Sequence, residues 1–211
     1  MTNVLTSIRT QARAGARVVA RKLDRWSSGR LTPAMVTWFG FLMHVPIAYL
    51  IATEHNLWAA AFLVFFGLFD ILDGGLAAVQ ERTSPQGMLL DASTDRMKEV
   101  LLYTGAAFAL ISSGHPKTAV WAVVACGASI CVSYVKAKGE AAVASGKKQI
   151  PHTVLNRMFG DGLVTFEIRM AILTAGLIFD QLYPAVLVIA VAASFTAFQR
   201  LYLISKALGK H

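Results

Sequence analysis

The sequence is poor in charge, because Asp, Glu, Lys and Arg make up only 15% of its 211 residues, against about 25% in a soluble domain. Apolar residues make up 55%, more than the roughly 45–50% of soluble domains. The two cysteines, Cys126 and Cys131, lie inside one apolar run, and no zinc-ligand spacing occurs. These features argue against a water-soluble globule, a disordered chain, and a zinc or disulfide pair.

The sequence contains long apolar segments of a length that can cross a membrane. Six stretches of about 18–22 residues are each long enough to cross about 30 Å of hydrocarbon at about 1.5 Å per residue. They cover residues 34–53, 57–77, 94–113, 117–136, 163–180 and 184–205. The sequence therefore predicts an all-α, polytopic membrane protein with six transmembrane helices, whose longest connection is the polar stretch 137–162.

The basic residues indicate how these spans are oriented. Lys and Arg outnumber Asp and Glu by 20 to 12, and membrane proteins concentrate Lys and Arg on the cytoplasmic side. With six crossings and the N-terminus inside, every Lys and Arg except Lys117 lies on or near that side. We therefore expect a multi-pass protein of the cell membrane with both termini in the cytoplasm.

The first 30 residues predict an amphipathic juxtamembrane helix. This segment has an arginine at every fourth position, and residues four apart on a helix are neighbours, so the arginines form a basic stripe along one face. In a chain with six membrane spans, a basic stripe indicates contact with anionic lipid rather than with nucleic acid. We divide the chain into this helix, residues 1–30, and a membrane domain, residues 31–211. The arginines of the stripe recur every four residues: Arg9, Arg13, Arg17, Arg21 and Arg25.

Four aspartates lie near the cytoplasmic ends of two consecutive spans. Asp70 and Asp73 stand three residues apart, and Asp91 and Asp95 stand four apart, so each pair shares a helical face. A turn around Ser84–Gly87 makes the two helices antiparallel, which can bring the four carboxylates together. Clustered carboxylates near a membrane need positive charge, and oxygen-only ligands suit Mg²⁺ or Mn²⁺. We expect two such ions to clamp a phosphate or pyrophosphate.

Two other interpretations use the same aspartates. They could cap helices at the membrane surface, paired with Arg96 or Lys98, but four aspartates together with Gly74 and Gly75 favour a ligand site, because the glycines remove side chains beside the carboxylates. An ion transporter is the second alternative. Transporters typically carry repeats and broken helices near the midplane, whereas this chain has no repeat and its acidic residues gather at one face.

The segment from Asp70 to Asp95 resembles the signature of the CDP-alcohol phosphatidyltransferases, D-x2-D-G-x2-A-R-x8-G-x3-D-x3-D. Every motif residue is present at its required position except the arginine, which is Ala78. The resemblance implies two metal ions on the four aspartates, Asp95 as general base, a CDP-linked lipid such as CDP-diacylglycerol as donor, a cytoplasmic active site and a homodimer. The residues that it implies around the CDP-lipid are Thr32, Asp70, Asp73, Gly74, Ala77, Ser84 and Gly87.

Basic residues near the inner ends of three later spans suggest a site for a phosphorylated acceptor. Lys136 and Lys138 end the fourth span, Arg169 lies in the fifth, and Arg200 in the sixth. Cations from three helices at one depth suit an anionic ligand. The surrounding residues resemble the phosphatidylinositol phosphate synthases of the family. Their motif Q-R-L is matched by residues 199–201, whereas Y-[IV]-K-A-R-A-E-A is matched in part and E-R-x-E-R only by its last arginine, Arg169. The resemblance implies a polyol phosphate acceptor, inositol phosphate in particular.

Two further alternatives stay open at this point. The acceptor motifs match incompletely, so an enzyme of the phosphatidylglycerophosphate synthase type fits the same residues. The replacement of the motif arginine by Ala78 is compatible with a catalytically impaired relative that still binds the CDP-lipid. Each reading shares the same membrane fold and the same aspartates.

Overall fold

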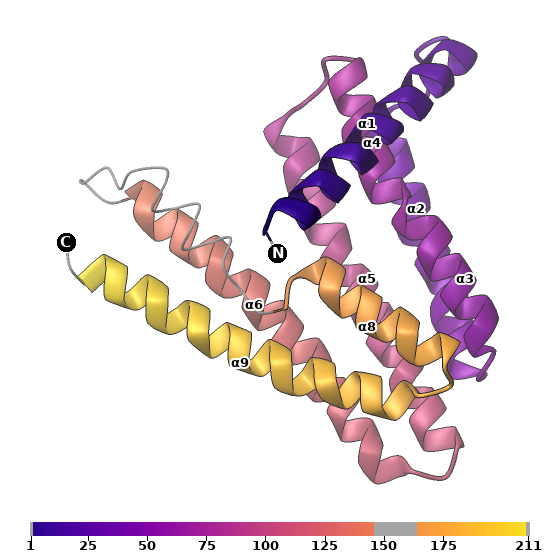
Figure 1. Ribbon diagram of the computed structural model, residues 1–211, viewed down its shortest axis with the longest axis vertical. Helices are drawn as coiled ribbons and strands as arrows, with labels where there is room; N and C mark the ends of the chain where they lie inside the picture. The colour runs from indigo at the N-terminus through magenta and orange to yellow at the C-terminus, as the bar shows by residue number, and fades with distance from the viewer. Residues whose placement is uncertain (1, 146–163, 210–211) are drawn as a thin grey trace. The chain divides into compact units, whose positions relative to one another are not determined.

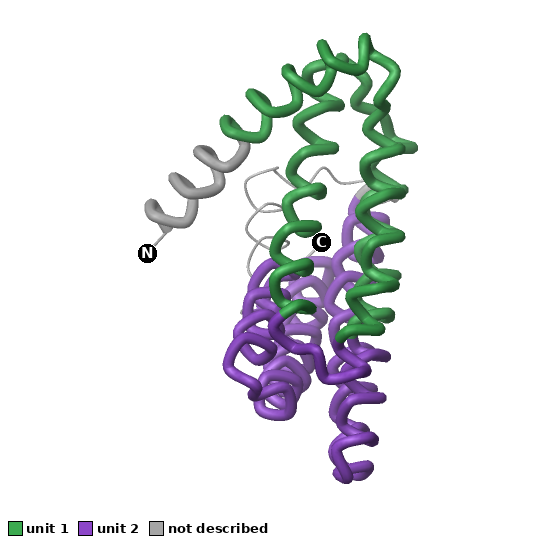
Figure 2. Tube along the Cα trace, turned by 90° about the vertical axis from the view of Figure 1, so that its right-hand side faces the viewer, with its two compact units in different colours: residues 1–50, 58–102 green, residues 51–57, 103–211 purple. Residues whose placement is uncertain are grey.

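The computed structural model describes residues 2–145 and 164–209 (Figure 1), and every regular element in these ranges is helical. The all-α prediction is therefore confirmed for this part of the chain. Contacts divide the chain into two compact units, residues 1–50 with 58–102 and residues 51–57 with 103–211 (Figure 2). The helices are α1 (Thr2–Ser27), α2 (Pro33–Ala52), α3 (Asn56–Gly67), α4 (Phe69–Val79), α5 (Pro85–Ser112), the 3₁₀ turn η1 (Pro116–Ala119), α6 (Val120–Ser145), α8 (Phe166–Ile178) and α9 (Leu182–Gly209).

Four helical segments of the described chain are long and apolar enough to cross a membrane: Pro33–Ala52, Asn56–Val79, Pro116–Val143 and Leu182–Gly209. They correspond to four of the six predicted spans, and such segments are the mark of an integral membrane protein. The α5 helix has 28 residues, but its N-terminal half is charged. The α8 helix has only 13 residues, fewer than the predicted span 163–180.

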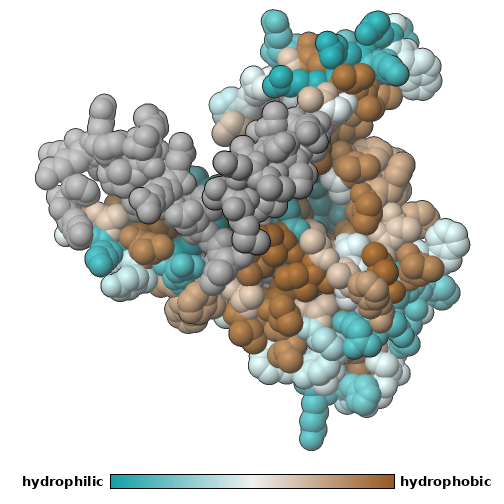
Figure 3. Space-filling view, viewed as in Figure 1, coloured by the Kyte–Doolittle hydropathy of each residue, from teal (hydrophilic) through white to brown (hydrophobic). Residues whose placement is uncertain are grey.

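Large apolar side chains are exposed along the helices, as the brown surface areas of Figure 3 show. In water such a surface would promote aggregation, whereas hydrocarbon is a good solvent for it. The exposure is pronounced on α3, where Trp58 is 63% exposed and Leu57 is 69% exposed. These side chains fit a helix that faces lipid.

In the first unit, α1 packs against α4. Ala20 of α1, Val36 of α2 and Leu76 of α4 form a buried apolar cluster. The side-chain amide of Gln80, just past the end of α4, donates to Asp24 Oδ1 at 2.7 Å and to the Leu31 carbonyl at 2.9 Å. Partly buried apolar residues pack against the cluster: Leu31, Phe69, Leu72 and Val79.

The close approach of α1 to α4 depends on Gly75. A Cβ atom on this glycine would lie 3.3 Å from the Ala16 carbonyl oxygen, so a side chain there would press on the backbone of α1. Gly75 therefore serves helix packing, not ligand access as the sequence suggested. A Cβ atom on the neighbouring Gly74 would meet nothing within 4 Å, which agrees with the expected open space beside the aspartates.

The predicted N-terminal helix is present over Thr2–Ser27. Arg17, Arg21 and Arg25 are exposed, whereas Ala20 is fully buried against the neighbouring helices. The side chains of Arg9 and Arg13 lie outside the described residues. The described part of α1 thus has a basic exposed face and an apolar packed face.

In the second unit, α9 lies beside α6 and also contacts α8. Small residues allow these close approaches. A Cβ atom on Gly176 of α8 would fall 2.3 Å from the Cβ atom of Ala185 in α9, so only glycine fits there. The buried residues of α9 include Val186, Ile189, Ala190 and Ala193.

Two helix boundaries differ from the sequence prediction. The third predicted span, 94–113, belongs to a helix that already begins at Pro85. Sequence reasoning missed this start because Pro85 and Gly87 are typical turn residues and because the charged residues between Asp91 and Glu99 lower the hydropathy. Ser84 caps this helix, since its Oγ accepts the Gly87 N–H at 3.1 Å. The predicted polar connection 137–162 is helical up to Ser145, and residues 146–162 lie outside the described part of the chain.

Candidate functional site

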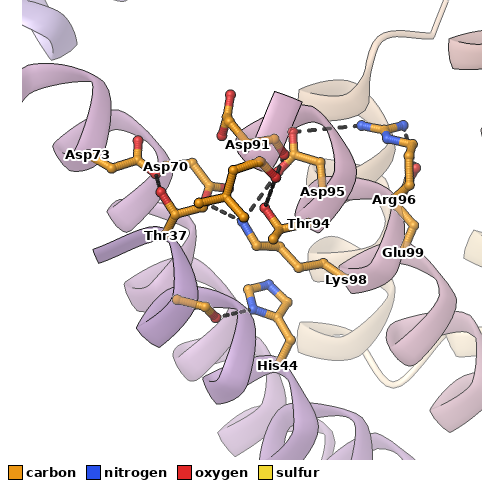
Figure 4. Close-up of polar contacts among 12 residues, drawn as sticks. Thr37, His44, Asp70, Asp73, Asp91, Thr94, Asp95, Arg96, Lys98 and Glu99 are labelled. Carbon is orange, nitrogen blue, oxygen red and sulfur yellow. Dashed lines mark hydrogen bonds and ion pairs between the residues drawn. The ribbon is translucent and has the colours of Figure 1, made fainter. Parts of the chain in front are cut away.

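The four predicted aspartates lie on two helices of the first unit (Figure 4). Asp70 and Asp73 belong to α4, and Asp91 and Asp95 belong to α5. The side chains of Asp70 and Asp95 are 20% and 19% exposed, and Asp73 is 6% exposed. Carboxylates that are this far removed from water require polar or charged partners.

The Lys98 ammonium joins the two helices that carry the aspartates. Its Nζ donates a short hydrogen bond to Asp70 Oδ1 of α4 and a second one, at 3.2 Å, to Asp95 Oδ1 of α5. The Lys98 side chain is fully buried. A buried ammonium is stable only where carboxylates compensate it, and here two of the four aspartates do so.

Asp73 has a different partner, a hydroxyl of α2. Thr37 Oγ1 donates to Asp73 Oδ2 at 2.6 Å, and the Gly74 N–H donates to Asp73 Oδ1 at 2.6 Å. Thr37 is 5% exposed, so this contact is closed to water. The aspartates of α4 are thus linked to α2 through Thr37 and to α5 through Lys98.

Asp91 completes the cluster without a partner of this kind. It lies close enough to Asp70, Asp73 and Asp95 to interact with them electrostatically, but no hydrogen bond or ion pair joins it to another described side chain. No three His, Cys, Asp or Glu side chains in the described ranges converge as a ready metal site. The carboxylates supply the correct oxygen donors for Mg²⁺ or Mn²⁺, and the Lys98 ammonium already supplies one positive charge among them.

Further charged and polar groups surround the cluster. Arg96 pairs with Glu99 at 2.5 Å and lies 3.8 Å from Asp95, while Glu99 is fully buried. On α2, His44 is 3% exposed, and its Nδ1 lies 2.7 Å from the Gly40 carbonyl oxygen. Figure 4 places its ring below the Lys98 amine.

The other residues expected around a CDP-lipid lie on or beside helices α2, α4 and α5 of the same unit. Thr32 precedes α2, and its Oγ1 accepts the Met35 N–H at 3.3 Å. Gly74 and Ala77 lie on α4, and Gly74 is exposed. Ser84 and Gly87 form the cap of α5 described above. Their role toward a lipid stays a prediction.

Two of the predicted acceptor residues, Arg169 and Arg200, come together in the second unit. Arg169 of α8 is 1% exposed and Arg200 of α9 is 6% exposed, and the two guanidinium groups are near enough to repel each other. Arg169 donates to the Val164 carbonyl at 3.0 Å, and Arg200 to the Val132 carbonyl at 3.3 Å. The Arg200 Nε is buried and has no hydrogen-bond partner in the described structure.

The two predicted lysines of α6 are exposed. Lys136 lies 3.8 Å from Glu140, itself an electrostatic neighbour of Arg200. The Lys138 ammonium lies 5.8 Å from the centre of the Tyr134 ring. Lys136 is therefore connected to Arg200 through Glu140, while the described contact of Lys138 is with an aromatic ring.

Sequence reasoning missed Thr37 and His44 and gave Lys98 only the role of a surface partner. The spacing of Lys98, three residues after Asp95, was a usable signal, because i and i+3 share a helical face. Thr37 and His44 carry no comparable local signal. Their positions beside the aspartates follow from how α2 packs.

A model of the CDP-alcohol phosphatidyltransferase family matches residues 30–198 of the chain. The chain belongs to this family. It is therefore a transferase, as the resemblance of the segment from Asp70 to Asp95 to the family signature implied. The family match extends across both units and includes every residue discussed above from Thr32 to Arg169.

Individual members of the family are also similar to the chain. Phosphatidylinositol phosphate synthase of Cutibacterium acnes is 34% identical over 140 residues, which cover 64% of this chain and 67% of that protein. A crystal structure of Mycobacterium tuberculosis phosphatidylinositol phosphate synthase with CDP-DAG bound has a TM-score of 0.74 at 26% identity and covers 90% of this chain and 92% of that one. The same enzyme with manganese and citrate has a TM-score of 0.74 at 25% identity, covering 90% and 88%.

The Thr37 contact predicts a stability effect. Replacing Thr37 with Val keeps the shape but leaves the buried Asp73 carboxylate without its hydroxyl donor, so we expect a loss of about 1–3 kcal/mol in stability. The measurement is thermal unfolding of the detergent-solubilised protein. Thr37→Ser is the matched control and should melt close to the native protein. Equal melting temperatures for the Val and Ser variants would contradict the proposed importance of the hydrogen bond.

Proposed function

We propose that this chain transfers the phosphatidyl group of CDP-diacylglycerol to inositol phosphate and releases CMP. The observation that carries the proposal is the joining of Asp70 and Asp95 across α4 and α5, at positions that match the family signature. Relatives named phosphatidylinositol phosphate synthase and a related structure with CDP-DAG bound support the choice of donor and acceptor.

Asp70, Asp73, Asp91 and Asp95 are the residues that we propose to hold divalent cations, two Mg²⁺ or Mn²⁺ ions. Their oxygen donors match the preference of these hard ions, and a related structure contains manganese. When bound, the ions would neutralise the phosphates and the negative charge that develops on them during transfer. Lys98 and Thr37 keep the aspartates oriented until then.

In the proposed reaction Asp95 is the general base. Its carboxylate removes the proton of the acceptor hydroxyl, whose oxygen forms a bond to the lipid-side phosphorus of CDP-diacylglycerol. The bond from that phosphorus to the bridging oxygen breaks, and CMP leaves with the electron pair. The residues that we propose to contact the CDP-lipid, besides Asp70 and Asp73, are Thr32, Gly74, Ala77, Ser84 and Gly87.

We assign the phosphate of the acceptor to Arg169 and Arg200, with Lys136 and Lys138 nearer the surface. Two guanidinium groups this near each other can bind one anion with charge-assisted hydrogen bonds. The Arg200 Nε, buried and without a partner in the described structure, has a donor to offer. A phosphate monoester has both the charge and the acceptor atoms for such a site.

The proposed topology has six crossings, with α5 and α8 completing the four apolar spans. The charged residues of α5 all precede residue 100, and residues 100–112 carry no charge. We place both termini and the aspartates at the cytoplasmic side of the cell membrane. Residues 1–30 then lie at the lipid surface and residues 31–211 in the membrane. A homodimer stays a prediction.

An assay of CMP release tests the function directly. The purified chain in detergent is given CDP-diacylglycerol, Mg²⁺ or Mn²⁺, and either inositol phosphate or glycerol phosphate. We expect metal-dependent CMP release with inositol phosphate. Release with glycerol phosphate alone would move the assignment to the phosphatidylglycerophosphate type, and lipid binding without release under either condition would indicate an impaired relative.

Asp95→Asn tests the general base. Since an amide cannot accept the hydroxyl proton, we expect kcat to fall by about 10²–10⁴-fold while CDP-diacylglycerol binding is largely kept. Steady-state kinetics and a lipid-binding titration measure the two effects. An unchanged kcat would remove Asp95 from this role.

Arg200→Ala tests the acceptor site. Losing a charged hydrogen bond is worth about 1.5–3 kcal/mol, so we expect the acceptor KM to rise about 10- to 100-fold with a smaller change in CDP-diacylglycerol affinity. Lys206→Ala, which removes an exposed cation from the same helix, is the control and should leave KM unchanged. A selective loss of CDP-diacylglycerol binding would contradict the assignment.

A further inference from the structure

Lys98 occupies the interior of the aspartate cluster, although the proposed reaction gives it no chemical step. Its Nζ contacts Oδ1 of both Asp70 and Asp95, and the side chain is fully buried. One of these contacts crosses from α5 to α4, so it is more than a local i, i+3 pair. In Figure 4 the amine lies between the two helices, on the side of the carboxylates.

The two oxygens that receive the Lys98 hydrogen bonds belong to proposed metal ligands. A carboxylate oxygen that accepts an ammonium hydrogen bond is less available to a metal ion, and a positive charge in the cluster repels an arriving cation. Asp91 has no such partner among the described side chains, and Asp73 is held by the neutral Thr37 hydroxyl. The cluster thus contains two carboxylates that accept a hydrogen bond from the Lys98 ammonium, Asp70 and Asp95, and two that do not, Asp73 and Asp91.

We propose that Lys98 is a tethered counter-ion of the aspartate cluster, which a divalent cation must displace from Asp70 and Asp95 in order to bind there. The inference rests on the proposed function in so far as the aspartates are metal ligands. Lys98 is then a positioning residue. It holds the carboxylates together in the absence of metal and lowers the affinity of the same carboxylates for metal.

The proposal predicts that removing the charge of Lys98 tightens divalent binding. The probe is MnCl₂ alone, titrated into the detergent-solubilised full chain without any CDP-lipid, with free Mn²⁺ followed by electron paramagnetic resonance. For Lys98→Met we expect the Mn²⁺ dissociation constant to fall by about tenfold, because one nearby positive charge is gone. Lys98→Gln keeps hydrogen-bond donors without the charge and should also bind more tightly.

Two controls separate a counter-ion from a merely structural residue. Lys98→Arg keeps the charge, so its Mn²⁺ affinity should stay within about twofold of the native value. Lys117→Met removes an exposed lysine of the second unit and should leave the affinity unchanged. Equal Mn²⁺ affinities for the native, Met and Gln proteins would overturn the proposal, as would weaker binding by both folded neutral variants.

Folding of the neutral variants is informative in itself. Without Lys98 the buried carboxylates repel one another, so the Met and Gln variants should melt at lower temperature than the native protein and gain more from added Mn²⁺ than it does. Variants that fold only with Mn²⁺ support the interchange of the two cations. Variants that fail to fold even with Mn²⁺ refute it, because the metal then cannot replace the ammonium.

The CMP assay keeps this inference distinct from the proposed function. If the native protein releases CMP but substitutions of Lys98 leave the Mn²⁺ affinity unchanged, only the counter-ion role is contradicted. If Lys98→Met binds Mn²⁺ more tightly but the native protein releases no CMP with either acceptor, the counter-ion role is supported and the proposed transfer reaction is contradicted.

Discussion

The first unit depends on one electrostatic constraint, the neutralisation of carboxylates that are withdrawn from water among apolar helices. Lys98 meets it for Asp70 and Asp95 and in doing so ties α4 to α5. Thr37 meets it for Asp73 and ties α2 to the same helix. Because polar contacts are scarce in such surroundings, the few that exist decide how the helices are arranged. The groups suited to chemistry are therefore also the groups that hold this part of the fold together.

The second unit buries charge of the opposite sign, in two guanidinium groups. Arg169 and Arg200 are both buried, and backbone carbonyls of Val164 and Val132 are among the acceptors of their hydrogen bonds. Close contact between α8 and α9 at Gly176 holds the helices that carry these two arginines. These are the arginines that we propose to bind the phosphate of the acceptor.

The aspartate site could be predicted from sequence because its information is local. Asp70 with Asp73, and Asp91 with Asp95, each lie within about one helical turn, and the spacing between the pairs matches a family motif. The partners of the carboxylates could not be predicted in the same way, because Thr37 is remote in the chain and Lys98 is ambiguous between a surface charge and a buried one. Hydropathy located the apolar helices but missed the start of α5, since Pro85 and Gly87 are typical turn residues and the charged residues from Asp91 to Glu99 separate this start from the apolar part of the helix.

The packing of α1 on α4 makes one face of the N-terminal helix part of the first unit's core. Ala20 covers Leu76 and Val36, and Asp24 accepts a hydrogen bond from Gln80 at the end of the helix that carries Asp70 and Asp73. Truncation of the first 27 residues would uncover this apolar surface and remove a hydrogen-bond acceptor from Gln80. An enzyme shortened in this way for expression should lose stability and activity together, even though none of the deleted side chains is assigned to the chemistry.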